Sequence, residues 1–193
     1  QMCIRDRKRV IHQDELNDAI YRNNDKFGYD FVNASLQEFG AKLNVNGIEN
    51  IPLQGGCIVV SNHPLGGLDG IALMSVVGGI RKDIRFLVND LLLNLKNFGD
   101  IFVPVNKHGK NTKENIRLYE EIYASEACVL IFPAGLVSRR QKSGNIMDLE
   151  WKKSFISKSI IYNKPIIPVF ICGRNSDFFY KLAFYRKKLG IKA

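Results

Sequence analysis

The sequence lacks several features that would place it in a class at once. No apolar run approaches the roughly 18 to 20 residues that a membrane-spanning helix needs, so any membrane contact is expected to be peripheral. The Arg-rich opening has no apolar signal-peptide core, and no internal repeat or low-complexity tract is present. The four cysteines show no CxxC spacing, and Cys57, Cys128 and Cys172 lie in apolar runs where a small hydrophobe is expected. This pattern favours a reducing, cytoplasmic setting.

The two ends of the sequence carry little pattern. The chain begins with Gln1, and the first ten or so residues have no helical periodicity, which leaves open whether they are native. The sequence stops just after a basic run, with no turn or closing strand. We therefore expect a longer protein whose true C-terminus lies beyond residue 193.

The composition is that of an ordinary globular protein, with 46% apolar and 24% charged residues in a chain of 193 residues. This length can bury a substantial core in one domain. The net charge of +9 raises the local concentration of anions, including nucleic acid, phospholipid head groups and phosphorylated carriers. The charge alone does not choose among these partners, nor does it exclude a merely solvated basic surface.

Strand-like and helix-like segments alternate along the chain. The patterns predict strands at 57–61, 84–88, 101–105, 128–132 and 165–171, helices at 71–77, 112–125 and 148–162, and a basic loop at 136–144. Gly78 and Gly79 are expected to end the first of these helices. Apolar strands divided by helices predict an α/β fold with a mostly parallel sheet flanked by helices, and Pro104 and Pro168 are expected at strand ends or edges. An N-terminal helical portion (1–42, with helix from about Asp14) precedes the main domain (43–193).

Two side chains near the end of the first strand could carry chemistry. His63 precedes Pro64, which favours an extended backbone at the carboxyl end of a strand, where α/β sheets place ligands. Asp69 follows across a loop made compact by Gly66 and Gly67. A carboxylate that orients an imidazole prepares it to take a proton from a hydroxyl. The spacing alone leaves two other interpretations open, because Asp69 could cap the next helix and His63 could be an ordinary loop histidine.

The wider pattern resembles the glycerolipid (lysophospholipid) acyltransferase family, which has an Asn-His at a strand end followed by Asp. Four blocks occur in the family's order: Ser61-Asn62-His63-Pro64-Leu65-Gly66-Gly67-Leu68-Asp69-Gly70, Gly99-Asp100-Ile101-Phe102-Val103-Pro104-Val105, Phe132-Pro133-Ala134-Gly135 and Pro165-Ile166-Ile167-Pro168-Val169. They extend from about residue 47 to residue 173.

The resemblance implies direct acyl transfer to a hydroxyl, with His63 as general base and Asp69 orienting it. Backbone amides near Gly66, Gly67 or Gly135 are expected to stabilise the oxyanion. The residues expected to bind substrate are Asn62, Gly66, Gly67, Lys107, Phe132, Pro133, Gly135 and Arg139. The expected donor is a fatty acyl thioester of acyl carrier protein or CoA, with no metal or other cofactor. The expected acceptor is a lysolipid, either a lyso-aminolipid or 1-acylglycerol-3-phosphate, and no nucleic-acid partner is expected.

Three departures from the family pattern narrow this interpretation. Five residues separate His63 from Asp69 instead of four, the glutamate of the third block is Ala134, and the arginine of the second block is absent, with Lys107 the nearest cation. These departures resemble the hemolysin-like O-acyltransferases of ornithine or glycine lipid synthesis. The alternative is a catalytically inactive module of the same fold that binds membrane or nucleic acid.

The last segment, 178–189, has a stripe of Phe178, Leu182, Tyr185 and Leu189 with basic residues elsewhere. An aromatic, basic amphipathic helix is typical of an interfacial membrane contact, although such a stripe also serves core packing. We expect the protein to lie at the inner face of the cytoplasmic membrane.

Overall fold

The computed structural model describes residues 13–105 and 113–188. Its centre is a five-stranded sheet in the order β3-β2-β4-β1-β7, in which every neighbouring pair is parallel. The strands are β1 (Cys57–Ser61), β2 (Ile84–Asn89), β3 (Phe102–Val105), β4 (Cys128–Ile131) and β7 (Ile166–Val169). The predicted α/β class is confirmed.

The central strands owe their place to apolar residues on both faces. Every residue of β1 is buried, and its partner β4 is buried through Leu130, with Cys57 opposite Cys128 and Val60 opposite Ile131. A strand covered on both faces needs a continuous apolar run, because neither face meets water. The strands that contain Pro104 and Pro168 are the two edges of the sheet, as predicted, since proline has no N–H for a second neighbour.

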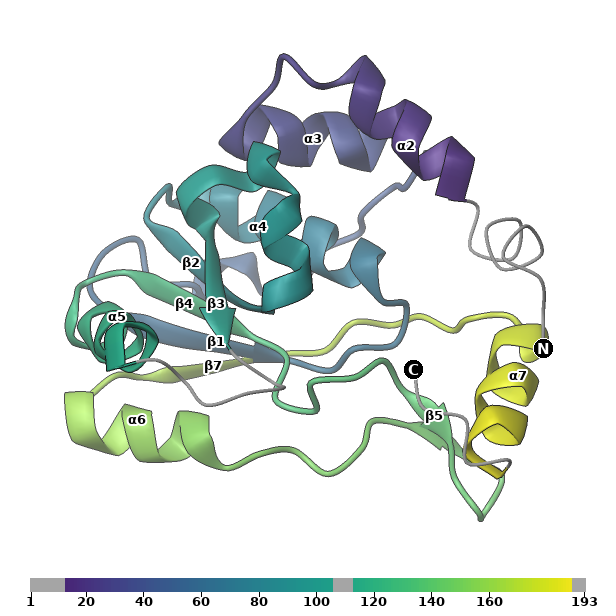
Figure 1. Cartoon of the computed structure of the whole chain (residues 1–193). Coiled ribbons are helices and arrows are strands. Elements are labelled where there is room, and N and C mark those ends of the chain that lie inside the picture. The colour runs from purple at the N-terminus through teal and green to yellow at the C-terminus, as the bar shows by residue number, and fades with distance from the viewer. Residues whose placement is uncertain (1–12, 106–112, 189–193) are drawn as a thin grey trace.

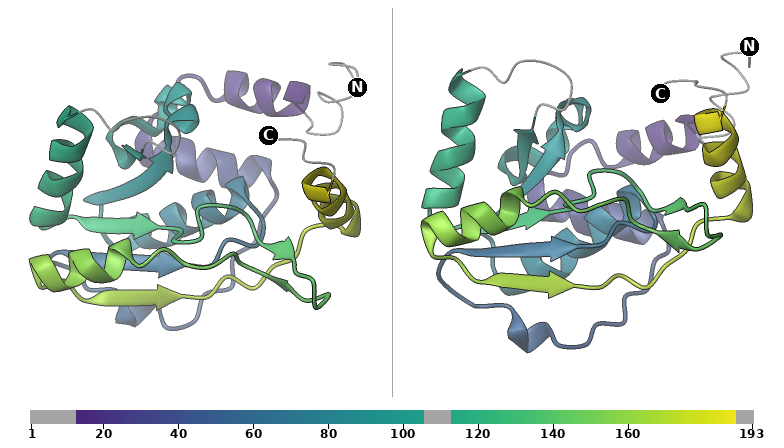
Figure 2. Two further views of the ribbon diagram at one scale, coloured as in Figure 1. Left: turned by 60° about the horizontal axis from the view of Figure 1, so that its bottom comes forward. Right: turned by 90° about the horizontal axis from the view of Figure 1, so that it is seen from below.

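Helices cover the two faces of the sheet as separate layers (Figures 1 and 2). One layer holds α2 (Gln13–Arg22), α3 (Gly28–Glu38) and α4 (Gly67–Ile80), and the other holds α5 (Lys113–Ala124) and α6 (Ser154–Tyr162). Each layer has its own core. Phe31 of α3 and Met74 of α4 pack with Val59, whereas Tyr123 of α5 and Phe155 of α6 pack with Val60. The predicted N-terminal helices are present, and the division at residue 42 stays a prediction.

The predicted end of the helix at Gly78 and Gly79 is wrong, because α4 runs from Gly67 through both glycines to Ile80. Gly78 serves packing instead of termination. A Cβ at this position would lie 2.2 Å from Cε1 of Tyr29, so glycine leaves room for the Tyr29 ring of α3 against α4. The first turn of the helix also begins before Asp69, which makes Asp69 a helical residue and not the N-cap.

The segment between β4 and α6 also differs from the prediction. Two residues of the predicted basic loop form β5 (Arg139–Arg140), which pairs antiparallel with β6 (Ile146–Met147). The following helix begins at Ser154, so Asp148 lies outside it. This hairpin contacts α7 (Asp177–Lys188) beside the carboxyl end of the sheet, as Figure 1 shows.

Short 3-10 turns, η1 (Ile48–Asn50), η2 (Asp90–Asn94) and η3 (Lys96–Ile101), complete the connections. Within the described part of the chain, no helix is both long and apolar enough to cross a membrane. Cys57 and Cys128 are buried as predicted, whereas Cys172 is exposed because it follows the edge strand β7.

Candidate active site

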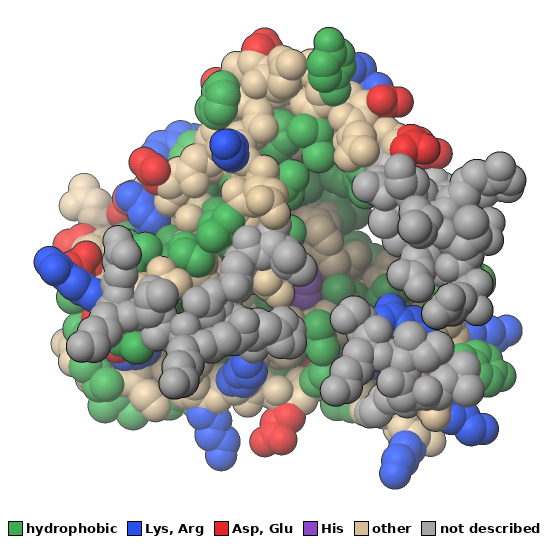
Figure 3. Space-filling view, viewed as in Figure 1, with side chains coloured by type: hydrophobic (Ala, Val, Ile, Leu, Met, Phe, Trp, Pro, Cys, Tyr) green, Lys and Arg blue, Asp and Glu red, His purple; other side chains and the backbone are tan. Residues whose placement is uncertain are grey.

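His63 lies just beyond the carboxyl end of β1. The strand ends at Ser61, and Pro64 lies just beyond His63 in a tight loop that leads into α4. In the space-filling view, a histidine side chain lies in a recess on this face of the molecule, bordered by hydrophobic side chains (Figure 3). The position matches the expectation that ligands of parallel sheets bind beyond the carboxyl ends of the strands.

The imidazole of His63 pairs with the carboxylate of Asp69. Nδ1 lies 3.0 Å from Oδ2, and the side chains of His63 and Asp69 are 16% and 0% exposed. Because a carboxylate only accepts hydrogen bonds, Nδ1 carries the hydrogen and Nε2 keeps its lone pair in the neutral ring. Among the described residues, none forms a hydrogen bond with Nε2. The pair therefore has the geometry of an oriented general base.

Asp69 performs two tasks at once. Its Oδ2 also accepts the N–H groups of Leu65 (2.7 Å) and Gly66 (2.9 Å), which satisfies orphan donors before the first turn of α4. Its Oδ1 is buried without a hydrogen-bond partner among the described residues. Asp69 is thus not the N-cap residue, which is Gly66, but as the third residue of α4 it caps the helix start and orients His63 through one oxygen.

Gly66 accommodates the five-residue spacing between His63 and Asp69, which is one residue longer than the family pattern. Gly66 has φ +92°, a conformation that side-chain-bearing residues rarely adopt. This turn brings Leu65 and Gly66 back over Asp69. The five-residue loop therefore keeps His63 and Asp69 in hydrogen-bond contact.

Aromatic rings fix the plane of the imidazole. His63 stacks on Phe132, with ring centroids 4.1 Å apart and planes 16° apart, and Phe132 meets Phe86 edge-on at 5.3 Å. Gly70 leaves room for this column, because a Cβ there would lie 3.2 Å from Phe86. Phe132 thus contacts the imidazole of His63 directly, which is one way in which the third block contributes to the candidate site.

Two of the three expected oxyanion donors are already used. The N–H of Gly66 donates to Asp69, and the N–H of Gly135 donates to the carbonyl of Phe132 at 2.9 Å. This part of the expectation is corrected, since both groups close turns of their own loops. Gly67 is exposed in the first turn of α4 and remains the candidate donor.

Asn62 has a defined structural partner. Its side-chain Nδ2 donates to the carbonyl of Ile171 (2.9 Å), and its Oδ1 accepts the N–H of Ile171 (2.6 Å). The amide thereby ties the end of β1 to the segment after β7, 109 residues away. Substrate binding by Asn62 stays a prediction, and these contacts give it a role in holding the strand ends together.

The third-block residues line a small pocket of about 140 Å³, and one of them, Phe132, is the ring that stacks on His63. Phe132, Pro133 and Gly135 share it with the ends of β2, β3 and β4 and with two polar side chains of the next segment; the other lining residues are Leu87, Val88, Asn89, Val105, Tyr119, Ile131, Lys152 and Ser154. The walls are mainly apolar. The structure therefore brings these three predicted residues together at one place.

Arg139 is half-buried on β5, close to the loop that carries His63. Its Nη1 donates to the carbonyls of Val137 and Ser138, and its guanidinium lies 4.9 Å from the ring centre of Phe179. Burial, with the nearby charge of Arg186, lowers the pKa of Arg139. No described carboxylate contacts it, so its charge is available to an anion. Lys107, the other predicted cation, lies outside the described residues.

Asp148 and Ser138 contact His63, and the sequence analysis missed both of these contacts. Asp148 accepts the main-chain N–H of His63 from 85 residues away, and Ser138 donates its N–H to the carbonyl of His63 at 2.8 Å. The sequence patterns placed Asp148 at the start of a helix. No local signal could have identified it, because its partners are distant in sequence.

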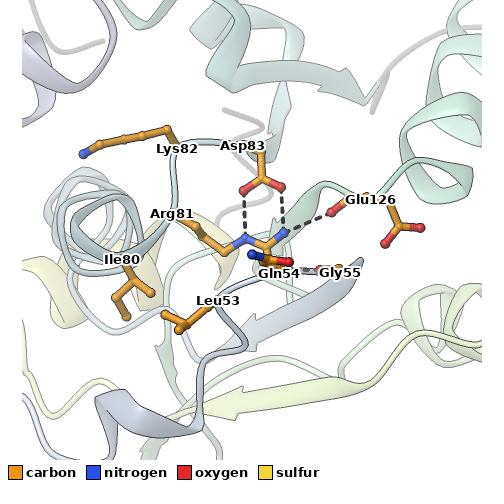
Figure 4. Close-up of a pocket in the computed structure, with 8 residues that line it drawn as sticks. All are labelled: Leu53, Gln54, Gly55, Ile80, Arg81, Lys82, Asp83 and Glu126. Atoms are coloured by element: carbon orange, nitrogen blue, oxygen red, sulfur yellow. Dashed lines mark hydrogen bonds and ion pairs between the residues drawn. The ribbon is translucent and has the colours of Figure 1, made fainter.

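A larger cavity of about 600 Å³ lies at the opposite end of the sheet, around Arg81 (Figure 4). The guanidinium donates to both oxygens of Asp83 and to three main-chain carbonyls. Its donors are thus satisfied by the protein itself. Among the described residues, no cluster of three or more His, Cys, Asp or Glu side chains could hold a metal ion.

Known sequences place this arrangement in a family. The sequence matches the family described as “Acyltransferase” over residues 1–193. It is 49% identical to the lyso-glycine lipid O-acyltransferase of Bacteroides thetaiotaomicron and 46% identical to that of Phocaeicola vulgatus, over 96% of this chain in each case. An uncharacterized protein of Mycobacterium leprae is 27% identical over 77% of the chain and 44% of its own length. No solved structure matches the chain.

The chain spans about two thirds of the two lyso-glycine lipid relatives, 66% of the Phocaeicola protein and 68% of the Bacteroides protein. The family assignment and the oriented His63–Asp69 pair agree with the resemblance in the four sequence blocks. The chain belongs to the acyltransferase family.

Proposed function

We propose that the protein is an O-acyltransferase that moves a fatty acyl group from an acyl carrier protein or CoA thioester to the hydroxyl of a lyso-glycine lipid. The observation that carries this proposal is the hydrogen bond of 3.0 Å between Nδ1 of His63 and Asp69, which leaves Nε2 facing no described partner. The names of the two relatives that are nearly half identical to this chain support the choice of acceptor.

In the proposed mechanism, the acceptor hydroxyl attacks the thioester carbonyl while Nε2 of His63 takes its proton. A new oxygen–carbon bond forms, the tetrahedral intermediate collapses, and the carbon–sulfur bond breaks. The proton on Nε2 then passes to the departing thiolate, which leaves as a thiol. Asp69 holds the tautomer throughout and stabilises the transient imidazolium. The N–H of Gly67 is the proposed oxyanion donor.

Arg139 is the proposed contact for the acceptor head group. A glycine that is acylated on its nitrogen carries a free carboxylate, which suits a half-buried guanidinium without a carboxylate of its own. A phosphate would fit the same cation, so 1-acylglycerol-3-phosphate is the competing acceptor. Lys107 stays a predicted substrate contact. The proposal of a glycine head group over an ornithine head group depends on the relatives alone.

The pocket formed by Phe132, Pro133 and Gly135 is the proposed place for the thioester end of the donor. Its apolar walls suit the first atoms of an acyl chain, and the wall formed by Phe132 is also the ring that stacks on His63. Lys152 lines the same pocket and supplies a positive charge near an anionic carrier. We expect no metal or other cofactor in this reaction.

Membrane contact through α7 belongs to the same proposal. Phe178, Phe184 and Tyr185 are exposed on this helix, and Lys181 and Lys188 add positive charge. Aromatic side chains at an interface and lysines toward anionic head groups are the two components of peripheral binding. The proposed location is the inner face of the cytoplasmic membrane, where a lysolipid acceptor is presented.

The test mixes the purified protein with a long-chain acyl thioester and one of three acceptors: lyso-glycine lipid, lyso-ornithine lipid or 1-acylglycerol-3-phosphate. We expect diacyl product with the glycine acceptor, and a loss of turnover of about 100- to 10,000-fold in His63→Ala while circular dichroism stays native. Equal turnover in that variant refutes the mechanism. Salt-sensitive nucleic-acid binding with no product from any acceptor favours the inactive binding module instead.

A further inference from the structure

A second carboxylate lies behind the catalytic histidine, on the side of its main chain. Asp148 follows β6 and accepts the N–H of His63 through both oxygens, at 3.2 Å each. It also accepts the hydroxyl of Ser138 at 2.5 Å and the indole N–H of Trp151 at 3.0 Å. None of these contacts involves the imidazole ring. Asp148 therefore acts on the backbone of His63 and not on the reacting atoms.

Ser138 also binds the main chain of His63. Its N–H donates to the carbonyl of His63 at 2.8 Å, and its hydroxyl gives its proton to Asp148, the shorter of the two contacts available to it. Both main-chain groups of His63 are thus bound by the 133–152 loop. These groups lie beyond the end of β1, where the strand ladder no longer satisfies them.

The loop itself is anchored at its base. The N–H of Lys152 donates to the carbonyl of Pro133 at 3.1 Å, which joins the two ends of the loop. Trp151 packs edge-on against Phe155, a buried residue of α6, with ring centroids 6.2 Å apart. The loop that carries Asp148 is therefore anchored to the hydrophobic core through Trp151 and Phe155. Because Asp148 is held in place, it can fix the position of the His63 main chain.

We propose that Asp148 is a positioning residue for acyl transfer, which locks the main chain of His63 so that the imidazole meets Asp69 and the substrate in one geometry. This role rests on the proposed function of His63 as general base. The same loop carries Arg139, the residue after Ser138, so the lock also fixes the base relative to the head-group contact. A catalytic group displaced by about 1 Å can lose about 100-fold in rate, so a fixed main chain matters here.

The chemistry of the position requires a carboxylate. Three donors converge on Asp148: the N–H of His63, the hydroxyl of Ser138 and the indole of Trp151. Two carboxylate oxygens can accept all of them, whereas an amide has one accepting oxygen and an NH₂ group that would face a donor. Asp148→Asn therefore keeps the size of the side chain and breaks the lock.

The experiment compares Asp148→Asn with Trp151→Phe, which removes one donor to Asp148 and leaves the link to His63. Turnover is measured with lyso-glycine lipid and the acyl thioester, and hydrogen exchange is measured at the His63 amide. We expect kcat of Asp148→Asn, per folded molecule, to fall at least about tenfold with KM for the acyl thioester unchanged. The His63 amide should exchange faster in Asp148→Asn alone, and Trp151→Phe should stay within about threefold in kcat.

A purely structural role would lower the thermal midpoint and the folded fraction without changing kcat per folded molecule. A kcat of Asp148→Asn within about threefold of wild type, with His63→Ala inactive, overturns the positioning role and leaves the proposed function standing. Activity in His63→Ala overturns both. If Asp148→Asn does not fold, Asp148→Glu replaces it. This variant keeps the charge on a longer stem, and the same kcat loss and faster His63 exchange are expected, whereas wild-type values for both overturn the role.

Discussion

The amino and carboxyl ends of the parallel sheet each bury a charged side chain beside a cavity. At the amino end, Arg81 is surrounded by acceptors that use its guanidinium donors, although the cavity there is the larger, at about 600 Å³ (Figure 4). At the carboxyl end, Asp69 orients His63 beside a cavity of about 140 Å³, and Nε2 has no partner among the described residues. The proposed substrate site is thus the smaller of these two cavities, so cavity volume did not select it. The candidate site is marked instead by the imidazole of His63, which Asp69 orients.

The charges at the two ends also serve different purposes. Arg81 links the segment before β1, the start of β2 and the segment before β4, so its bonds hold separate parts of the chain together. Asp69 holds one ring at a fixed angle and caps its own helix. We therefore expect changes at the amino end to alter stability and changes at the carboxyl end to alter turnover.

The largest effect on turnover should follow Asp69→Asn. The amide can still accept one hydrogen bond, but it no longer fixes the tautomer or stabilises a charged imidazole, so kcat should fall by about 100-fold or more. Steady-state kinetics with lyso-glycine lipid measure this. Asp83→Asn is the matched control at the amino end and should stay within about twofold in kcat. Equal losses of kcat in the two variants would show that the two ends of the sheet do not differ in their effect on turnover.

Arg81→Met should have the largest effect on stability. The change removes the hydrogen bonds from the guanidinium to the carbonyls of Pro52, Gly55 and Glu126. Each contributes about 1 kcal/mol net, so the free energy of unfolding should fall by about 3 kcal/mol. Urea unfolding measures this difference. The kcat per folded molecule should be unchanged, and a drop in kcat with stability intact would show that the amino end takes part in function.

Filling the two cavities separately gives a sharper test of which one binds substrate. Val105→Trp places a large ring in the pocket beside Phe132 and should raise KM for the acyl thioester about tenfold. Leu53→Trp does the same in the amino-end cavity and should leave both kinetic constants within about twofold. A rise in KM for Leu53→Trp but not for Val105→Trp would move the donor site to the other end of the sheet.

The smallest expected effect is a pH dependence at the amino end. The hydrogen bonds and charge of Arg81 lower the pKa of Asp83 below its usual value of 3.8. The stabilisation is therefore present above about pH 4 and disappears as the pH falls through the lowered pKa, because the unfolded state binds the proton first. The difference in unfolding free energy between wild type and Asp83→Asn should shrink as the pH falls from about 6 to 3. Asp83 is half exposed, so a difference above about 1 kcal/mol is not expected.

Much of this molecule follows from the sequence because the signals are local. The apolar runs identify five strands of a parallel sheet, and the prolines at 104 and 168 mark its edges. His63 and Asp69 are six residues apart, so one strand end, one loop and one helical turn suffice to bring them together. Two predictions were wrong because the conformation depends on contacts with residues elsewhere. Gly78 does not end its helix but makes room for Tyr29, and the predicted loop at 136–144 contributes strand β5 to a hairpin.

The tertiary structure decided everything that depends on contacts between distant segments. It gave Asn62 a partner 109 residues away, placed Asp148 against the backbone of His63, and showed that the N–H groups of Gly66 and Gly135 are already used. A sequence specifies its local conformations through periodicity, proline and glycine, and these determined the sheet and the His63–Asp69 pair. Which buried polar groups form hydrogen bonds with one another depends on how the strand ends and loops pack. The bond from the N–H of His63 to Asp148 joins residues 85 apart, so the local sequence around either residue does not predict it.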